Sequence, residues 1–335
     1  ITHLGKDWRP VGHILDERAF VNGIVGLMAT GGSTNLILHL PAMARAAGIL
    51  LLPEDFDAVA QVVPLLCKVY PNGLADVNHF HAAGGMGWLV GELLAAGLVH
   101  DDVETVAGTG LHLYAREPRL IDGELTWADA PRTALNDRIL RPVADPFQPT
   151  GGLRQLTGNL GTGVIKTSAV APERHVLQAP ARVFASQEAV KAAFKAGEFT
   201  ADTVVVVRFQ GPRANGMPEL HSLTPMLAVL QDRGLKVALV TDGRMSGASG
   251  KVPAAIHLSP EALANGPIAL VRDGDIITLD CERGLLQLEV DEVTLAAREV
   301  RHPDLSANAH GTGRELFGLF RTHAGTAETG GSPLI

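Results

Sequence analysis

Apolar residues in the first 150 positions recur mostly at the spacing of an α-helix. A helix capped by Asp16 is expected first. Its apolar positions are Phe20, Val21, Ile24, Val25 and Met28. Ser33 is expected to cap the next helix, and residues 85–97 are expected to form another. The run "ILLL" at 49–52 predicts a short buried strand between helices.

From about residue 150 the pattern changes to short β-branched runs separated by helical stretches, which is typical of an α/β fold. The runs are 163–170, 203–209, 235–241 and 268–280, and the helical stretches are 188–197 and 224–234. Asp273-Gly274, inside the last run, predicts a hairpin. The density of Pro and Gly at 145–152 predicts two domains, 1–150 and 151–335. The tail, 322–335, is expected to be mobile.

Composition narrows the class of protein. Hydrophobic residues make up 46% and charged residues 19% of the 335, as in globular proteins. A net charge of -8 argues against a nucleic-acid partner, because a phosphate backbone needs a basic face. No apolar run is long enough to predict a membrane span, and Cys67 and Cys281 are too far apart for a metal-binding CxxC motif. We therefore expect a cytoplasmic protein.

Two predicted strands are each followed by a loop whose residues could bind a ligand or take part in a reaction. In "GPRANGMPELHS" (211–222) the one carboxylate, Glu219, could bind Mg²⁺, or it could simply be solvated. The segment "TDGRMSGASGKVPAAIH" (241–257) resembles a phosphate loop, but its Lys251 is not followed by the hydroxyl residue that a nucleotide P-loop needs. Ligands of open α/β sheets bind where loops leave the carboxyl ends of strands, so the two loops predict a joint site.

Two further motifs remain ambiguous on their own. "TGGSTN" (30–35) could bind an anion at a helix N-terminus, or it could be an ordinary turn and cap. "HFH" (79–81) could supply two metal ligands from one face of an extended segment, or two polar loop histidines. Ser246 lacks the G-x-S-x-G context of a hydrolase nucleophile, which disfavours a plain hydrolase.

Taken together, four motifs resemble the dihydroxy-acid and phosphogluconate dehydratase family. They are "TGGSTN" (30–35), "HAAGGM" (81–86), "GMPE" (216–219) and "DGRMSG" (242–247), which stand in the family's order. Within the family, "YPNGLADVNHFHAAGGM" and "DGRMSGASGKVPAAIH" look more like the phosphogluconate branch than the branched-chain dihydroxy-acid branch.

The resemblance implies a hydro-lyase that converts 6-phospho-D-gluconate to 2-dehydro-3-deoxy-6-phosphogluconate and water in the Entner–Doudoroff pathway. It implies Mg²⁺ held partly by Glu219, an iron–sulfur cluster (4Fe-4S or 2Fe-2S), a homodimer, and Ser246 as the base at C2. Substrate contacts are expected from Ser33, Thr34, Asn35, His81, Arg244 and Gly247. We add Lys251 as a phosphate contact, because a cation stands there in an amide-rich loop.

In one respect the chain departs from the family pattern. The family's cluster cysteines lie upstream of the segment that corresponds to Ile1, and Cys67 and Cys281 match none of them. The resemblance therefore implies a helical α/β remainder of the cluster domain, followed by a strand-rich, β-barrel-like swivelling α/β domain, and an isolated chain without cluster or activity. Two alternatives stay open: a sister sugar-acid or dihydroxy-acid dehydratase, and a non-catalytic remnant that binds an anionic sugar acid.

Overall fold

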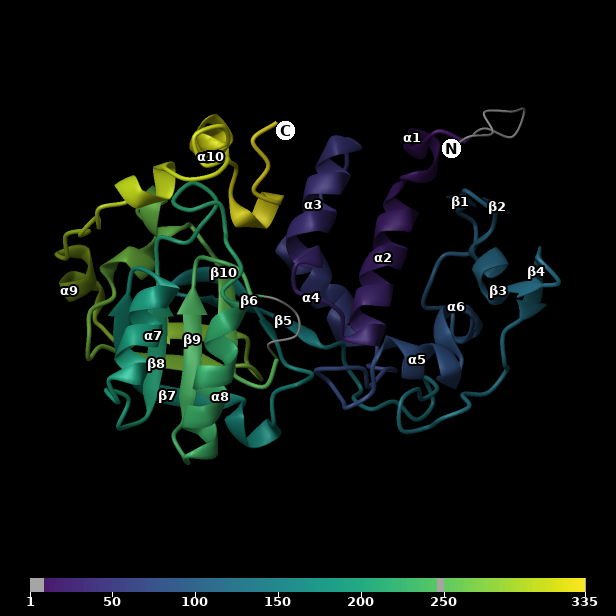
Figure 1. The fold of residues 1–335 in the computed structure, drawn as a ribbon, viewed down its shortest axis with the longest axis horizontal. Coiled ribbons are helices and arrows are strands. Elements are labelled where there is room, and N and C mark those ends of the chain that lie inside the picture. Colours follow the sequence, from purple (N-terminus) through teal and green to yellow (C-terminus); the bar gives the residue numbers. More distant parts are fainter. Residues whose placement is uncertain (1–8, 246–249, 335) are drawn as a thin grey trace. The chain divides into compact units, whose positions relative to one another are not determined.

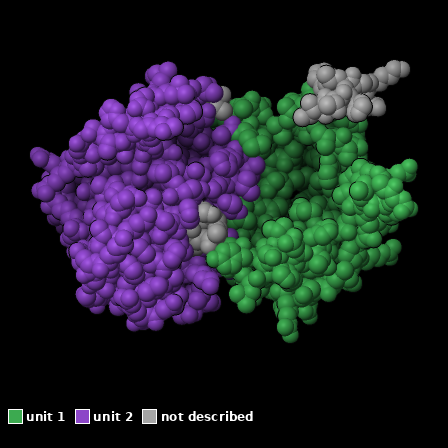
Figure 2. All heavy atoms as spheres, in the orientation of Figure 1, with its two compact units in different colours: residues 1–32, 43–50, 58–152 green, residues 33–42, 51–57, 153–335 purple. Residues whose placement is uncertain are grey.

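The structure, a computed structural model, describes residues 9–245 and 250–334 (Figure 1). The chain forms two compact units (Figure 2). Unit 1 comprises Ile1–Gly32, Met43–Leu50 and Ala58–Gly152, and unit 2 comprises Ser33–Ala42, Leu51–Asp57 and Leu153–Ile335. Unit 2 therefore contains the strand-rich part of the chain and two short segments from earlier in the sequence. Across the described residues, no helix combines the length and apolar character needed to cross a bilayer.

Unit 1 is mainly helical, as the sequence predicts. Asp16 caps α2 by accepting a hydrogen bond of 2.8 Å from the amide of Ala19, and Gly31 ends the helix in the left-handed region at φ 55°. The described elements of unit 1 are α1 (Val11–Ile14), α2 (Glu17–Thr30), α5 (Val77–Ala83), α6 (Gly85–Ala95), β1 (Glu104–Thr105), β2 (Gly108–Thr109), the 3₁₀ turn η1 (Leu111–Tyr114), β3 (Arg116–Ile121) and β4 (Glu124–Asp129).

Two helices, α3 (Leu36–Ala46) and α4 (Pro53–Val62), contribute residues to both units. The strand predicted at 49–52 is wrong, because these residues form the short link between the two helices. Leu50 is largely exposed in that link, and the amide of Leu52 donates to the carboxylate of Asp55 at 2.8 Å, which fixes the start of α4.

Unit 2 is built around a closed barrel whose strands follow the order β10-β6-β5-β12-β11-β7-β8-β9. This confirms the predicted α/β fold with a barrel-like second part. The strands are β5 (Leu153–Gly158), β6 (Gly161–Lys166), β7 (Val176–Phe184), β8 (Thr203–Val207), β9 (Val237–Thr241), β10 (Ala254–Ser259), β11 (Ile276–Asp280) and β12 (Leu285–Leu288). The helices are α7 (Gln187–Lys195), α8 (Thr224–Asp232), α9 (Glu292–Ala296) and α10 (Gly318–His323). Short 3₁₀ turns are η2 (Pro172–Arg174), η3 (His221–Leu223), η5 (Ala262–Ala264), η6 (Pro267–Leu270), η7 (Ser306–Ala309) and η8 (Ala327–Thr329).

Strands β7, β8, β9 and β10 pair in parallel. Helices α7 and α8 connect successive strands and lie over them (Figure 1), so β8 and β9 are buried at every position. Burial on both faces explains their continuous Val-rich runs. Because β8 and β9 are parallel neighbours, the loops that follow them leave the same end of the barrel.

Two further predictions in unit 2 are wrong. The residues before Asp273-Gly274 form the turn η6 rather than a strand, so no hairpin forms there; β11 pairs instead with β7 and β12. Asp273 accepts a 2.7 Å bond from the amide of Val183, which holds the turn against β7. The tail is also packed in its described residues, since Ala324 and Ala327 are buried.

Candidate functional site

The loops after β8 and β9 meet at Glu219 and Arg244. These residues form a parallel bridge in which the amide of Leu220 donates to the carbonyl of Arg244 at 3.1 Å. The Arg244 guanidinium (Nη1) lies 2.9 Å from Glu219 Oε1. Its Nε also donates to the carbonyl of Met217 at 2.6 Å. The bonds to both backbone and side chain hold the carboxylate and the guanidinium in fixed orientation.

Asp242, the first residue after β9, links the two loops through hydrogen bonds. Its buried carboxylate accepts from the amides of Phe209 (3.2 Å), Gln210 (2.9 Å) and Ala262 (2.9 Å). Burial raises the pKa of Asp242 to about 6, against the opposing effect of these backbone bonds. Backbone amides of two other segments donate to this one carboxylate, so Asp242 stabilises the relative positions of the segments that form the site.

The segment before α3, which also belongs to unit 2, completes the site. Asn35 Nδ2 donates to Glu219 Oε1 at 2.9 Å, and the buried hydroxyl of Thr34 donates to the carbonyl of Met245 at 3.0 Å. Ser33 does not cap the helix as predicted, because α3 begins three residues later; its hydroxyl accepts from the amide of Asn35 in a local turn. Residues about 180 positions apart in sequence thus meet at one carboxylate.

Several polar atoms at the site are buried and, within the described residues, lack hydrogen-bond partners. They include Glu219 Oε2 and Asn35 Oδ1. Both are oxygen atoms, the donor type that Mg²⁺ prefers, so they fit part of a magnesium coordination shell. The described residues contain no group of three or more His, Cys, Asp or Glu side chains that could bind a metal ion. Glu219 and Asn35 could therefore supply two ligands, and other oxygens would have to complete the shell.

His257 is a buried residue beside this cluster that the sequence did not single out. It lies on β10 where the register with β6 shifts, and its own φ is 59°. Both ring nitrogens lack a partner among the described residues. Burial lowers its pKa to about 3, with smaller contributions from the charges of Arg244 and His39. His257 is therefore neutral at neutral pH.

The two histidines of "HFH" do not present metal ligands from one face of an extended segment, which was one of the two interpretations left open. His79 and His81 lie on the helix α5, not on an extended segment, so residues two apart project in different directions. His79 Nδ1 instead lies 2.7 Å from Asp76 Oδ1, and the two residues form a capping box at the start of α5. His81 is exposed and belongs to unit 1, whereas the cluster around Glu219 belongs to unit 2.

Ser246 and Gly247 lie outside the described residues, so their predicted roles stay predictions. Lys251 is described and exposed. The cysteines do not fit an iron–sulfur cluster: Cys67 and Cys281 are buried in different units, and burial raises the pKa of each thiol to about 12. Cluster ligands need to be thiolates, which this burial disfavours.

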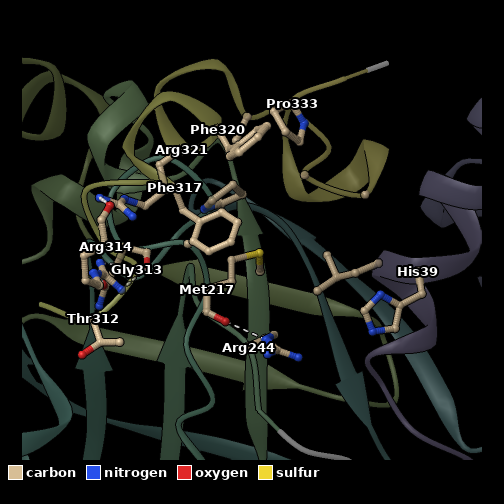
Figure 3. A pocket seen from close by; sticks show the side chains of 17 residues that line it. His39, Met217, Arg244, Thr312, Gly313, Arg314, Phe317, Phe320, Arg321 and Pro333 are labelled. Atoms are coloured by element: carbon tan, nitrogen blue, oxygen red, sulfur yellow. Dashed lines mark hydrogen bonds between the residues drawn. The ribbon is translucent and has the colours of Figure 1, made fainter. Parts of the chain in front are cut away.

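A pocket of about 460 Å³ within unit 2 adjoins the group of residues around Glu219 and Arg244 (Figure 3). Arg244 and His39 lie toward one side of the view, and Arg314 and Arg321 lie toward the other. Arg314 and Arg321 could not be selected from the sequence, because they stand in a stretch without a recognisable motif.

Comparison with known proteins matches the sequence of this chain to one family. Residues 1–114 match the family model described as dihydroxy-acid/6-phosphogluconate dehydratase N-terminal, and residues 138–331 match the corresponding C-terminal model. A phosphogluconate dehydratase of Rhizobium meliloti (strain 1021) is 57% identical over 336 residues, which cover 100% of this chain and 55% of the relative.

Two other relatives illustrate the range of the family. The phosphogluconate dehydratase of Escherichia coli (strain K12) is 56% identical over 98% of this chain and 55% of its own length. A dihydroxy-acid dehydratase of Ignicoccus hospitalis is 42% identical over 86% of this chain and 50% of its own length. The chain spans about half the length of the curated relatives it matches. These matches confirm the resemblance: the chain belongs to the dihydroxy-acid/6-phosphogluconate dehydratase family.

Proposed function

We propose that this chain carries part of the active site of a hydro-lyase that converts 6-phospho-D-gluconate to 2-dehydro-3-deoxy-6-phosphogluconate and water. The observation that carries the proposal is the Glu219 carboxylate, which has one buried oxygen without a described partner and stands between Asn35 and Arg244. The higher identity to relatives named phosphogluconate dehydratase than to the dihydroxy-acid dehydratase supports the choice of substrate.

The reaction removes a proton from C2 and a hydroxide from C3, and the resulting enol becomes the 2-keto acid. A proton next to a carboxylate is weakly acidic unless positive charge stabilises the enediolate that develops. Glu219 and Asn35 would contribute to holding Mg²⁺, which supplies that charge when bound. Arg244 orients Glu219 and adds positive charge at the same place.

Ser246 is the proposed proton acceptor. It directly follows Met245, whose carbonyl is anchored by Thr34, and Arg244, whose side chain is fixed by Glu219 and Met217. A serine hydroxyl is a poor base in water, so the role requires nearby positive charge that stabilises the alkoxide. Arg244 is a described source of such charge.

The remaining predictions concern the complete protein. Residues 1–150 are proposed to complete a cluster-bearing domain, and 151–335 to be the domain with the catalytic loops. Because Cys67 and Cys281 do not fit an iron–sulfur cluster, we assign no step to that group. Homodimeric assembly, a cytoplasmic location and substrate contacts from Ser33, His81 and Gly247 stay predictions.

The test is a substrate panel with a complete, metal-loaded polypeptide of the relatives' length that contains this chain. It compares 6-phosphogluconate, gluconate and a branched 2,3-dihydroxy acid, with the 2-keto product measured by its semicarbazone or by mass. We expect the highest kcat/KM for 6-phosphogluconate. A higher kcat/KM for the branched acid would indicate the sister activity, and absence of product from all three would indicate a binding remnant.

A further inference from the structure

The pocket beside Glu219 has an unusual charge for this chain. Among the residues that the structure describes, three arginines line it, Arg244, Arg314 and Arg321, and no Asp or Glu side chain does. The chain as a whole has 36 acidic and 28 basic residues, so a cavity with several guanidinium groups and no carboxylate is a local concentration of positive charge. Such a concentration attracts anions.

Arg314 and Arg321 lie close together and are fixed by neutral oxygens. Arg314 donates to the carbonyl of Asn308 at 2.6 Å and to Asn215 Oδ1 at 2.7 Å. Arg321 donates to the carbonyl of Arg314 at 3.1 Å. In the described part of the chain, neither guanidinium pairs with a carboxylate. Burial, and secondarily the charge of Arg321, lowers the pKa of Arg314, so the two cations repel each other unless an anion is bound.

The size and place of the pocket suit a small substrate. Its volume of about 460 Å³ is in the range usual for small-molecule sites. Arg244 lines the pocket and also binds Glu219, so the pocket is continuous with the proposed catalytic cluster. Figure 3 shows Phe317 between the two sides of the pocket, where its ring could pack against a carbon chain.

We infer that this pocket binds the phosphate group of the substrate, and that Arg314 and Arg321 are the residues that contact it. The inference rests on the proposed function, which it deepens by assigning the preference for a phosphorylated sugar acid to named side chains. A phosphate monoester carries close to two negative charges at neutral pH, and the planar guanidinium forks can bind its oxygens bidentately.

This assignment competes with the one made from the sequence. The sequence indicates Lys251 because a cation stands there in an amide-rich loop, and Lys251 is exposed. Arg314 and Arg321 stand instead in a defined cavity beside Glu219. The two assignments predict opposite results for single substitutions, so one experiment separates them.

The probe is glucitol 6-phosphate, which has the phosphate and the carbon chain but no carboxylate, and hence no acidic C2 proton to lose. Its dissociation constant is measured by calorimetry on the complete protein for wild type, Arg321→Gln, Arg321→Lys and Lys251→Met. The matched control is Arg301→Gln, which removes the same charge from an exposed residue outside the pocket. Unphosphorylated glucitol shows how much of the binding depends on the phosphate.

We expect Arg321→Gln to weaken binding of glucitol 6-phosphate about 10- to 100-fold, the usual effect of losing one hydrogen-bonded contact between opposite charges. Arg321→Lys should lose less, and Arg301→Gln and Lys251→Met should bind like wild type. The inference is overturned if Arg321→Gln binds like wild type, if Lys251→Met shows the loss instead, or if wild type binds glucitol as tightly as its phosphate.

A second measurement needs no variant and so does not depend on the folding of Arg321→Gln. Hydrogen exchange of wild type with and without glucitol 6-phosphate should show slower exchange in peptides spanning residues 308–324, and unchanged exchange there would refute the site. The substrate panel stays separate. If the wild-type protein dehydrates 6-phosphogluconate but Arg321→Gln binds glucitol 6-phosphate as tightly as wild type, only the assignment of the phosphate to this pocket is rejected. If the wild-type protein binds glucitol 6-phosphate but dehydrates none of the three acids, only the proposed function is rejected.

Discussion

Replacing His257 with Asn should make unit 2 less sensitive to acid. His257 is buried at the β10 irregularity, and its amide donates to the carbonyl of Gly243 at 2.9 Å. Asn is a suitable replacement because it tolerates the positive φ of 59° better than most residues and does not titrate in this range. The exposed His323 on α10 offers a matched control, His323→Asn.

The size of the effect follows from the pKa. The folded side chain has a pKa of about 3, against an ordinary value of 6.5 in the unfolded chain. Between these values the unfolded state binds a proton that the folded state does not, so stability is lost as the pH falls below 6.5. Each pH unit in that range is worth about 1.36 kcal/mol, so the loss between about pH 7 and about pH 5 is roughly 2 kcal/mol.

The assay must report on unit 2. The two tryptophans that the structure describes, Trp88 and Trp127, belong to unit 1, so tryptophan fluorescence would not report on unit 2. Hydrogen exchange of the buried strands β8 and β9, measured by mass spectrometry and corrected for intrinsic rates, gives the free energy of opening of the barrel. It is compared at both pH values for wild type, His257→Asn and His323→Asn.

Wild type and His323→Asn should lose about 2 kcal/mol more than His257→Asn over this pH range. His257→Asn is less stable at neutral pH if the smaller side chain leaves a cavity, so the comparison uses the change with pH within each variant. An equal change with pH in His257→Asn and wild type would refute the reasoning, because the acid sensitivity would then arise from other groups.

Three further outcomes are expected. Ser246→Ala in the complete enzyme should lower kcat by about 10²–10⁴, the effect of losing a general base, and a loss of roughly tenfold would indicate a simple hydrogen bond instead. The 335-residue chain should bind no iron–sulfur cluster on anaerobic reconstitution, because Cys67 and Cys281 are buried thiols with raised pKa values; a stable visible absorbance with matching iron and sulfide would contradict this. Asp242→Ala should destabilise unit 2 by about 3 kcal/mol or more, since three buried amides lose their acceptor. The control Asp232→Ala, at an exposed residue, should change stability by less than about 0.5 kcal/mol. Equal effects of the two substitutions would show that Asp242 does not stabilise the site.

The sequence predicted the barrel helices and strands well where one pattern was decisive. The Val-rich β8 and β9 are continuous apolar runs because α7 and α8 cover one face and the barrel interior covers the other. Parallel pairing of these two strands brings their loops together, so the contact between Glu219 and Arg244 could be anticipated from topology.

Other features depend on contacts that no local pattern encodes. Asp273-Gly274 has the composition of a hairpin turn, but Asp273 and Gly274 both bond to β7, which holds the turn against that strand. Likewise, the spacing of the two histidines in "HFH" suggests an extended segment, but Asp76 caps α5 and the histidines lie on that helix. The meeting of Asn35 with Glu219 requires a segment from far upstream to join unit 2.

The central claim is that the cluster around Glu219 supports removal of the C2 proton of 6-phosphogluconate. The most direct measurement is the rate of C2–H loss in deuterium oxide, followed by NMR, for the complete, metal-loaded protein and its Glu219→Gln and Glu282→Gln variants, the second being exposed and outside the cluster. Charge stabilisation of the developing enediolate is worth several kcal/mol, so C2–H loss with Glu219→Gln should be slower by roughly a hundredfold or more, and should require more Mg²⁺. With Glu282→Gln, C2–H loss should proceed at the wild-type rate. C2–H loss at the wild-type rate in Glu219→Gln would contradict the claim.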